Sequence, residues 1–284
     1  MAINQKLYRR RQFSNRLGLS LSMGSMLLGL AVLSWILFVL LANGVAALDA
    51  NLFTQDTPAP GTEGGGLRNA IVGSLMMVGC TLLLATPVGI LAGVYLAEYG
   101  DTSKTAELTR LVTDIMLSAP SIVLGLFVYA IAVATAGGFS GWAGTLALSL
   151  IAVPVVVRTT ANMLRLVPGS LREAAFALGA PRWKVATLVT LRAARSGVMT
   201  GLLLAVARIS GETAPLLFTA LNNQFFSIDM SKPMANLPVV IFQFAMSPYE
   251  NWIRLAWAGA LLITLAVLVL NIIARVFFRD TTPR

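Results

Sequence analysis

The chain has 284 residues, of which 57% are hydrophobic and 12% are charged, and its mean hydropathy is +0.78. Soluble domains carry about 25% charged residues, so this composition excludes an ordinary soluble domain and indicates a protein embedded in lipid. There is no histidine, and Cys80 is the single cysteine. A disulfide framework within the chain, a His/Cys metal cluster and the commonest general base are therefore excluded.

Six apolar windows follow one another along the chain. A basic tail over residues 1–20 precedes the first window at 21–42. That window is longer than the apolar region of a signal peptide, so we expect a retained membrane helix. An acidic, glycine-rich external loop is expected over 43–67. The remaining windows cover residues 70–96, 115–134, 142–157, 196–220 and 255–278.

The distribution of basic residues predicts the orientation of these windows. With the N-terminus in the cytoplasm, the tails and the loops 98–114 and 158–195 would hold 17 of the 21 lysines and arginines. The external loops would hold three, and Arg208 lies within the fifth window. This asymmetry follows the positive-inside rule, so we predict six transmembrane helices with both termini in the cytoplasm. The net charge of +9 is thereby explained by topology, and no nucleic-acid partner is expected.

A short helix is predicted in the basic loop 158–195. Ser170 stands three residues before Glu173, which is the spacing of a capping box, and Gly179 suits the position after the helix end. Two readings remain open: its apolar face lies on the membrane or the bundle, or it docks into a groove on a separate protein. That face consists of Leu171, Ala174, Ala175 and Leu178, which follow helical spacing.

Three segments carry a family resemblance. Glu173-Ala174-Ala175 followed by Gly179 resembles the EAA loop of ABC importer permeases. The longer stretches 172–184, 207–220 and 236–248 resemble the PstA-type permease subunits of phosphate importers, and the likeness extends from about residue 67 to the C-terminus. The sequence departs from the general family pattern at Leu191, which is followed by Arg192 where the family has proline.

The resemblance implies an all-α polytopic protein of the bacterial inner membrane with the type I ABC importer permease fold. The permease domain would cover 68–278, with the cytoplasmic EAA loop at 158–195, an external loop at 221–252 and a cytoplasmic tail at 279–284. In the family, the EAA helix couples the permease to its ATPase, a role that falls here on Glu173, Ala174, Ala175 and Gly179.

The implied partners are a paralogous permease (PstC type), an ATPase dimer (PstB type) and an external phosphate-binding protein (PstS type), with phosphate as the cargo. The chain contains no Walker A loop, so ATP would bind the partner ATPase. We expect no cofactor, no metal site and no catalysis within this chain.

Two opposite charges lie in the fifth window. Arg208 and Glu212 are four residues apart, so a continuous helix would bring them onto one face. Charges at the bilayer centre cost about 2.5–3.5 kcal/mol each on insertion scales, and they normally face a bundle interior or water. The pair could simply stabilise packing, or Arg208 could offer donors to a passing oxyanion. The resemblance favours a place in the substrate pathway for Arg208 and, with it, Glu212 and Thr213.

Three alternatives remain open from the residues alone. The same machine could carry another oxyanion, such as sulfate or molybdate. The chain could instead be an ion-coupled secondary transporter in which Glu212 carries a proton. It could also be a membrane scaffold with no transport activity.

Overall fold

The computed structural model describes residues 5–100 and 103–277, and all regular secondary structure within them is helical. The predicted tail 279–284 lies outside the described residues. The helices are α1 (Gln5–Ala46), α2 (Asn51–Thr54), α3 (Arg68–Glu98), α4 (Lys104–Ser118), α5 (Ser121–Val128), α6 (Ala134–Ala136), α7 (Gly141–Arg165), α8 (Gly169–Ala177), α9 (Arg182–Lys184), α10 (Leu191–Ala193), α11 (Arg195–Ser210), α12 (Ala214–Leu217), α13 (Leu237–Ala245) and α14 (Glu250–Phe277), with π-helical turns η1 (Tyr129–Val133) and η2 (Val185–Thr190).

Four of these helices, α1, α3, α7 and α14, are long and apolar enough to cross a membrane. Two further candidates are bent pairs: α4 meets the α5–α6 segment at 107°, and the α9–α10 segment meets α11 at 73°. The described residues therefore offer four spans, or up to six if each bent pair is one span. Pro120 precedes α5 and stands at the first bend, where its ring disfavours a continuous helix.

The helices of the structure extend beyond several of the predicted apolar windows and divide one of them. The basic tail 1–20 is helical from Gln5 and continues without a break into the first membrane window, because no proline or capping signal interrupts it. The fourth window continues to Arg165, since Thr160, Ala161 and Leu164 remain buried. The fifth window is not one helix: α11 ends at Ser210 and the short α12 follows.

Helix α7 is the centre of the bundle, with 72% of its apolar window buried. It packs closely against α3, where Gly89 and Gly93 are spaced for close helix approach. A Cβ added at either glycine would lie 2.6 Å from a side-chain carbon of α7, on Val156 and Thr160 respectively. The glycine pair thus permits a close approach, and α3 and α7 form one tightly packed unit.

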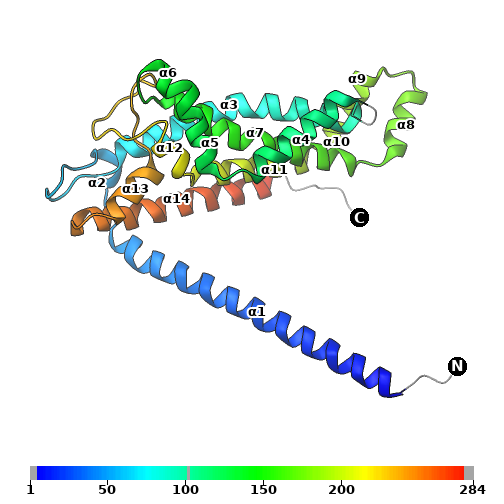
Figure 1. The fold of residues 1–284 in the computed structure, drawn as a ribbon, viewed down its shortest axis with the longest axis horizontal. Helices are drawn as coiled ribbons and strands as arrows, with labels where there is room; N and C mark the ends of the chain where they lie inside the picture. The colour runs from blue at the N-terminus through cyan, green and yellow to red at the C-terminus, as the bar shows by residue number, and fades with distance from the viewer. Residues whose placement is uncertain (1–4, 101–102, 278–284) are drawn as a thin grey trace.

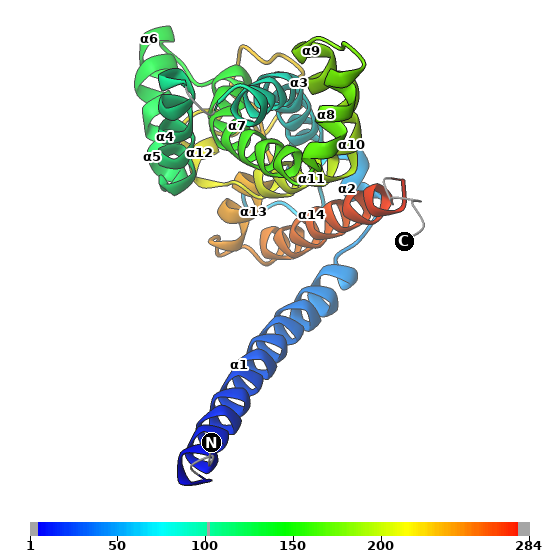
Figure 2. The same cartoon turned by 90° about the vertical axis from the view of Figure 1, so that its right-hand side faces the viewer.

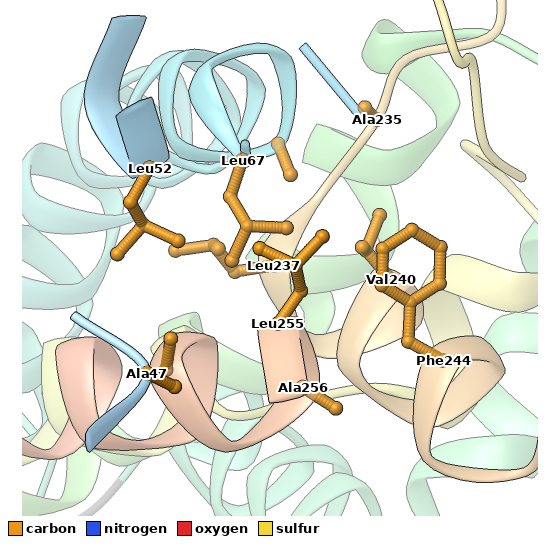
Figure 3. Close-up of a cluster of buried hydrophobic side chains, with 11 residues drawn as sticks. Ala47, Leu52, Leu67, Ala235, Leu237, Val240, Phe244, Leu255 and Ala256 are labelled. Carbon is orange, nitrogen blue, oxygen red and sulfur yellow. The ribbon is translucent and has the colours of Figure 1, made fainter. Parts of the chain in front are cut away.

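One end of the bundle is closed by a hydrophobic cluster (Figure 3). It joins the end of α1, the short α2, the start of α3, and α13 with α14. Leu52 and Leu67 are almost fully buried there. Asn236 begins α13, and its side chain accepts a hydrogen bond from the amide of Val239 at 3.0 Å. As expected from its length, α13 is too short to span and instead packs into this end.

Helix α1 diverges from the rest of the bundle (Figures 1 and 2). None of its membrane window is buried within the chain. Near its C-terminal end Gly44 lies against Leu261 and Trp257 of α14, and the absence of a side chain permits that close approach. The apolar surface of α1 is therefore available to lipid or to another membrane subunit.

Candidate functional site

Helix α8 lies at the opposite end of the molecule from α2 and α13 (Figure 1). The predicted capping box is wrong: the helix begins directly after Pro168, so Ser170 lies within it, and no side chain caps the first turn. The predicted C-terminal end is confirmed. Gly179 has φ +76°, its amide donates to Phe176 O at 2.9 Å, and the amide of Ala180 donates to Ala175 O at 3.1 Å. These two bonds form a Schellman motif.

The surface of α8 is open. None of its residues is buried. Leu171 is 45% exposed and Phe176 is 44% exposed, while Leu178, just after the helix, is 88% exposed. Glu173 is also exposed, and no ion pair to it is found among the described residues. This chain's own residues therefore cover the apolar face only in part, and both readings of it remain open.

Arg172, on the same helix, joins α8 to the bundle. Its guanidinium forms a salt bridge with Glu98, the last residue of α3, at 3.0 Å. It also donates to the carbonyl oxygens of Leu164 and Val167, each at 2.8 Å. The side chains of Arg172 and Glu98 are only 21% and 11% exposed. One arginine thus binds the C-terminal ends of both α3 and α7.

The second group of predicted residues surrounds the break between α11 and α12. Arg208 lies in the last turn of α11, while Glu212 lies beyond the helix end, so the expectation that both lie on one helix face was wrong. Gly211 interrupts the helix there, and the amides of both Gly211 and Glu212 make only turn-type bonds back into α11. Arg208 Nε and Glu212 Oε1 are 3.9 Å apart, with side-chain exposures of 42% and 16%.

Thr213 directly precedes α12, and its side chain makes no capping hydrogen bond. Pro215, in the first turn of α12, packs closely against α5: a Cβ on Gly125 would lie 2.5 Å from Pro215 Cα. The structure therefore brings Arg208, Glu212 and Thr213 together at one interrupted helix end. The EAA residues of α8 lie apart from them, beyond the start of α11 (Figure 1).

Glu98 was not recognised from the sequence as a functional residue. It lies 74 positions before Arg172, and no local pattern pairs residues at that separation. The only available signals were its place at the end of an apolar window and the arginine directly before Glu173. Within the described residues, no group of three or more His, Cys, Asp or Glu side chains could hold a metal ion.

The sequence matches a known family and several curated proteins. Residues 86–283 match the family model described as binding-protein-dependent transport system inner membrane component. The chain is 60% identical over 269 residues to the phosphate transport system permease protein PstA of Yersinia pestis, covering 95% of this chain and 91% of that protein. It is 59% identical to the protein of the same name from Haemophilus influenzae, over 98% and 99% of the two chains.

Solved structures share the fold at low sequence identity. A bacterial alginate ABC transporter, crystallised with a periplasmic protein bound to an alginate pentasaccharide, has a chain that matches with a TM-score of 0.67 at 13% identity. That match covers 95% of this chain and 96% of the other. An inward-facing MetNI methionine ABC transporter matches with a TM-score of 0.59 at 18% identity, over 76% and 94% of the chains.

The all-helical bundle and these structural matches confirm the type I ABC importer permease fold. A family of this kind places ATP hydrolysis on a separate ATPase, so the permease itself is not an enzyme. The chain belongs to the binding-protein-dependent transport system inner membrane components, and within them to the PstA-type permease subunits.

Proposed function

We propose that this chain is a membrane-spanning permease subunit of an ATP-driven importer of inorganic phosphate. The observation that carries the proposal is 60% identity, over 95% of the chain, to a protein named as a phosphate transport system permease. We infer that its partners are a paralogous permease of PstC type, an ATPase dimer of PstB type and an external phosphate-binding protein of PstS type. ATP binds the ATPase, and this chain converts ATPase closure into alternating access.

The coupling contact is assigned to α8. An isolated helix of nine residues is too short to be stable in water, and its exposed apolar side chains need a cover. A groove on the ATPase would bury Leu171, Leu178 and the small side chains of Ala174 and Ala175, while Glu173 would contact a basic or amide group. Gly179 ends the helix in a left-handed conformation that a side chain would disfavour.

The anion pathway is assigned to the break after α11. The 16 residues of α11 rise about 24 Å, which is less than the bilayer's hydrocarbon thickness of about 30 Å. Irregular backbone at that depth is tolerated only inside protein or beside water. Arg208 holds Glu212 at 3.9 Å, beyond hydrogen-bond distance, so its donors remain available to an oxyanion, with Glu212 and Thr213 beside it.

The proposed orientation puts the N-terminus, the C-terminus and α8 in the cytoplasm, with six spans formed by the four long helices and the two bent pairs. In a Cys80→Ala background, a cysteine replacing Leu178 should react with a membrane-impermeant maleimide only from the inside. A cysteine replacing Phe225, which is 78% exposed on the other end, should react only from the outside. The reverse pattern would overturn the orientation.

The function itself is tested in proteoliposomes that contain the two permeases and the ATPase. Uptake of radiolabelled phosphate should require ATP at the ATPase face and the binding protein at the opposite face. Uptake of sulfate or molybdate in place of phosphate would assign another oxyanion. Uptake driven by a proton gradient without ATP, and lost in Glu212→Gln, would instead establish a secondary transporter.

A further inference from the structure

One side chain makes the polar attachment of α8 to the ends of α3 and α7. None of the residues of α8 is fully buried. Arg172 and Ala175 are half-buried, whereas Glu173 and Ala174 are exposed. Besides its packing against η2, the helix is therefore held on the bundle by the polar contacts of Arg172.

Those contacts have the geometry of strong hydrogen bonds. Arg172 Nε and Nη2 lie 3.2 Å and 3.0 Å from Glu98 Oε1, while Nη1 and Nη2 donate to two main-chain carbonyl oxygens. Carboxylate–guanidinium bonds are about twice as strong as neutral ones. The carbonyl oxygens belong to Leu164, in the last turn of α7, and to Val167, just beyond it. Carbonyls at a helix end lack the usual partner four residues on and favour a nearby cation, and that of Leu164 also accepts a turn bond from the Val167 amide at 3.2 Å.

The two helices that Arg172 binds move as one body if their packing is kept. Gly89 and Gly93 of α3 allow contacts with α7 that leave no room for a Cβ. The same kind of contact joins α7 to α11, where a Cβ on Gly201 would lie 2.4 Å from Thr159 Oγ1. A displacement of the ends of α3 and α7 would therefore reach α11, which carries Arg208 at its far end.

We propose that Arg172 and Glu98 form a bridge that transmits movement of α8 to the α3–α7 unit and thereby couples ATP hydrolysis to transport. Arg172 acts as a positioning residue: it touches neither cargo nor nucleotide, and its donors hold α8 in one orientation on two helix ends. The inference rests on the proposed function, because it requires that α8 receives the motion of an ATPase.

The bridge is tested in the reconstituted transporter with three variants. Arg172→Gln removes the charge and most of the donors, Arg172→Lys keeps the charge but lacks the fork that reaches both carbonyls, and Glu98→Gln keeps only a neutral acceptor. Phosphate transported per ATP hydrolysed should fall about tenfold in Arg172→Gln and about threefold in each of the other two, as expected for an element of a coupling network. The amount of ATPase that co-purifies, and the rate of ATP hydrolysis, should change less than about twofold.

The matched control is Arg192→Gln, which removes an exposed arginine of the same loop from α10. It should leave phosphate transported per ATP unchanged. A second measurement tests the bridge by replacing it: cysteines at Glu98 and Arg172, in the Cys80→Ala background, are joined by a short bis-methanethiosulfonate reagent. The double variant should be uncoupled, and cross-linking should restore transport per ATP.

The outcomes separate the bridge from the proposed function. If the unmodified complex takes up no phosphate with ATP, the proposed function fails. If wild type transports but Arg172→Gln keeps normal transport per ATP, the bridge has no coupling role. If Arg172→Gln loses the ATPase altogether and the cross-link restores binding, Arg172 serves assembly and the coupling role is overturned.

Discussion

Two Arg–Glu pairs mark the two ends of the proposed transport path, and they differ in the distance within the pair, in the exposure of the arginine and in the arginine's other partners. Arg172 and Glu98 lie 3.0 Å apart, both are largely buried, and Arg172 has two further acceptors. Arg208 and Glu212 lie 3.9 Å apart, the arginine side chain is 42% exposed, and the backbone between them is not helical. The first pair joins three segments of the chain, whereas the second lies within a single helix end.

This difference indicates that the two arginines have different roles, one structural and one in anion binding. A guanidinium has five donors, and those of Arg172 are largely used within the chain, so it is suited to hold helices in position. Within residues 5–100 and 103–277, Arg208 makes one long side-chain contact, so most of its donors are free to bind an anion that arrives and leaves. A loosely held charge at a helix break also avoids binding the cargo too rigidly to release it.

The largest effect that would test this comparison is expected for Arg208→Gln. Loss of the charge should lower phosphate uptake about 100-fold, because removing a charged hydrogen-bond donor from a bound anion costs about 3 kcal/mol. Co-purification with the second permease and the ATPase should be unchanged. Failure of the subunits to assemble would give Arg208 a structural role and make the two pairs alike.

The next largest effect is expected for Glu173→Lys on α8. Glu173 is exposed and makes no ion pair among the described residues, so the substitution should leave the fold and membrane insertion intact. ATPase binding and uptake should each fall about tenfold, since one charged contact at an interface is worth about 1.4 kcal/mol or more. Glu63→Lys, the same charge reversal at an exposed position of the loop 43–67, is the control for general charge effects. Normal uptake in Glu173→Lys would exclude α8 as the docking helix.

The smallest effect is expected for the packing of α3 against α7, which connects the two Arg–Glu pairs. Gly93→Val would place a branched side chain where a single Cβ already lies 2.6 Å from Thr160, so unfolding should become easier by about 1–3 kcal/mol. The melting temperature in detergent should fall by a few degrees. Gly79→Ala is the control, because a Cβ at Gly79 meets nothing within 4 Å. An unchanged melting temperature in Gly93→Val would show that α3 and α7 are not rigidly packed there.

Much of the site could be predicted because its signals are local. The end of α8 at Gly179 follows from a glycine, a preceding apolar stretch and a following proline. The spacing of Gly89 and Gly93 permits a close contact with another helix, and the structure shows that this helix is α7. The prediction of a capping box was wrong because the helix begins directly after Pro168. A spacing of three residues between Ser170 and Glu173 does not specify where the first turn begins.

The break at Gly211 shows a different limit. The apolar composition continues to residue 220, so hydropathy alone predicts one helix. It carries no information about the helical hydrogen bonds that are lost at Gly211 and Pro215. The structure shows that the helix ends at Ser210, which places Glu212 outside it.

By itself the sequence determined the class of protein, the apolar windows and the family, because composition and short motifs are properties of neighbouring residues. Only the tertiary structure decided that Glu98 meets Arg172 and that the surface of α8 remains uncovered. Contacts between residues 74 positions apart depend on how whole helices pack, and many packings are compatible with one hydrophobic pattern. Such contacts also decide that the donors of Arg172 are bonded within the chain while most donors of Arg208 are not, and this separates the two ends of the proposed path.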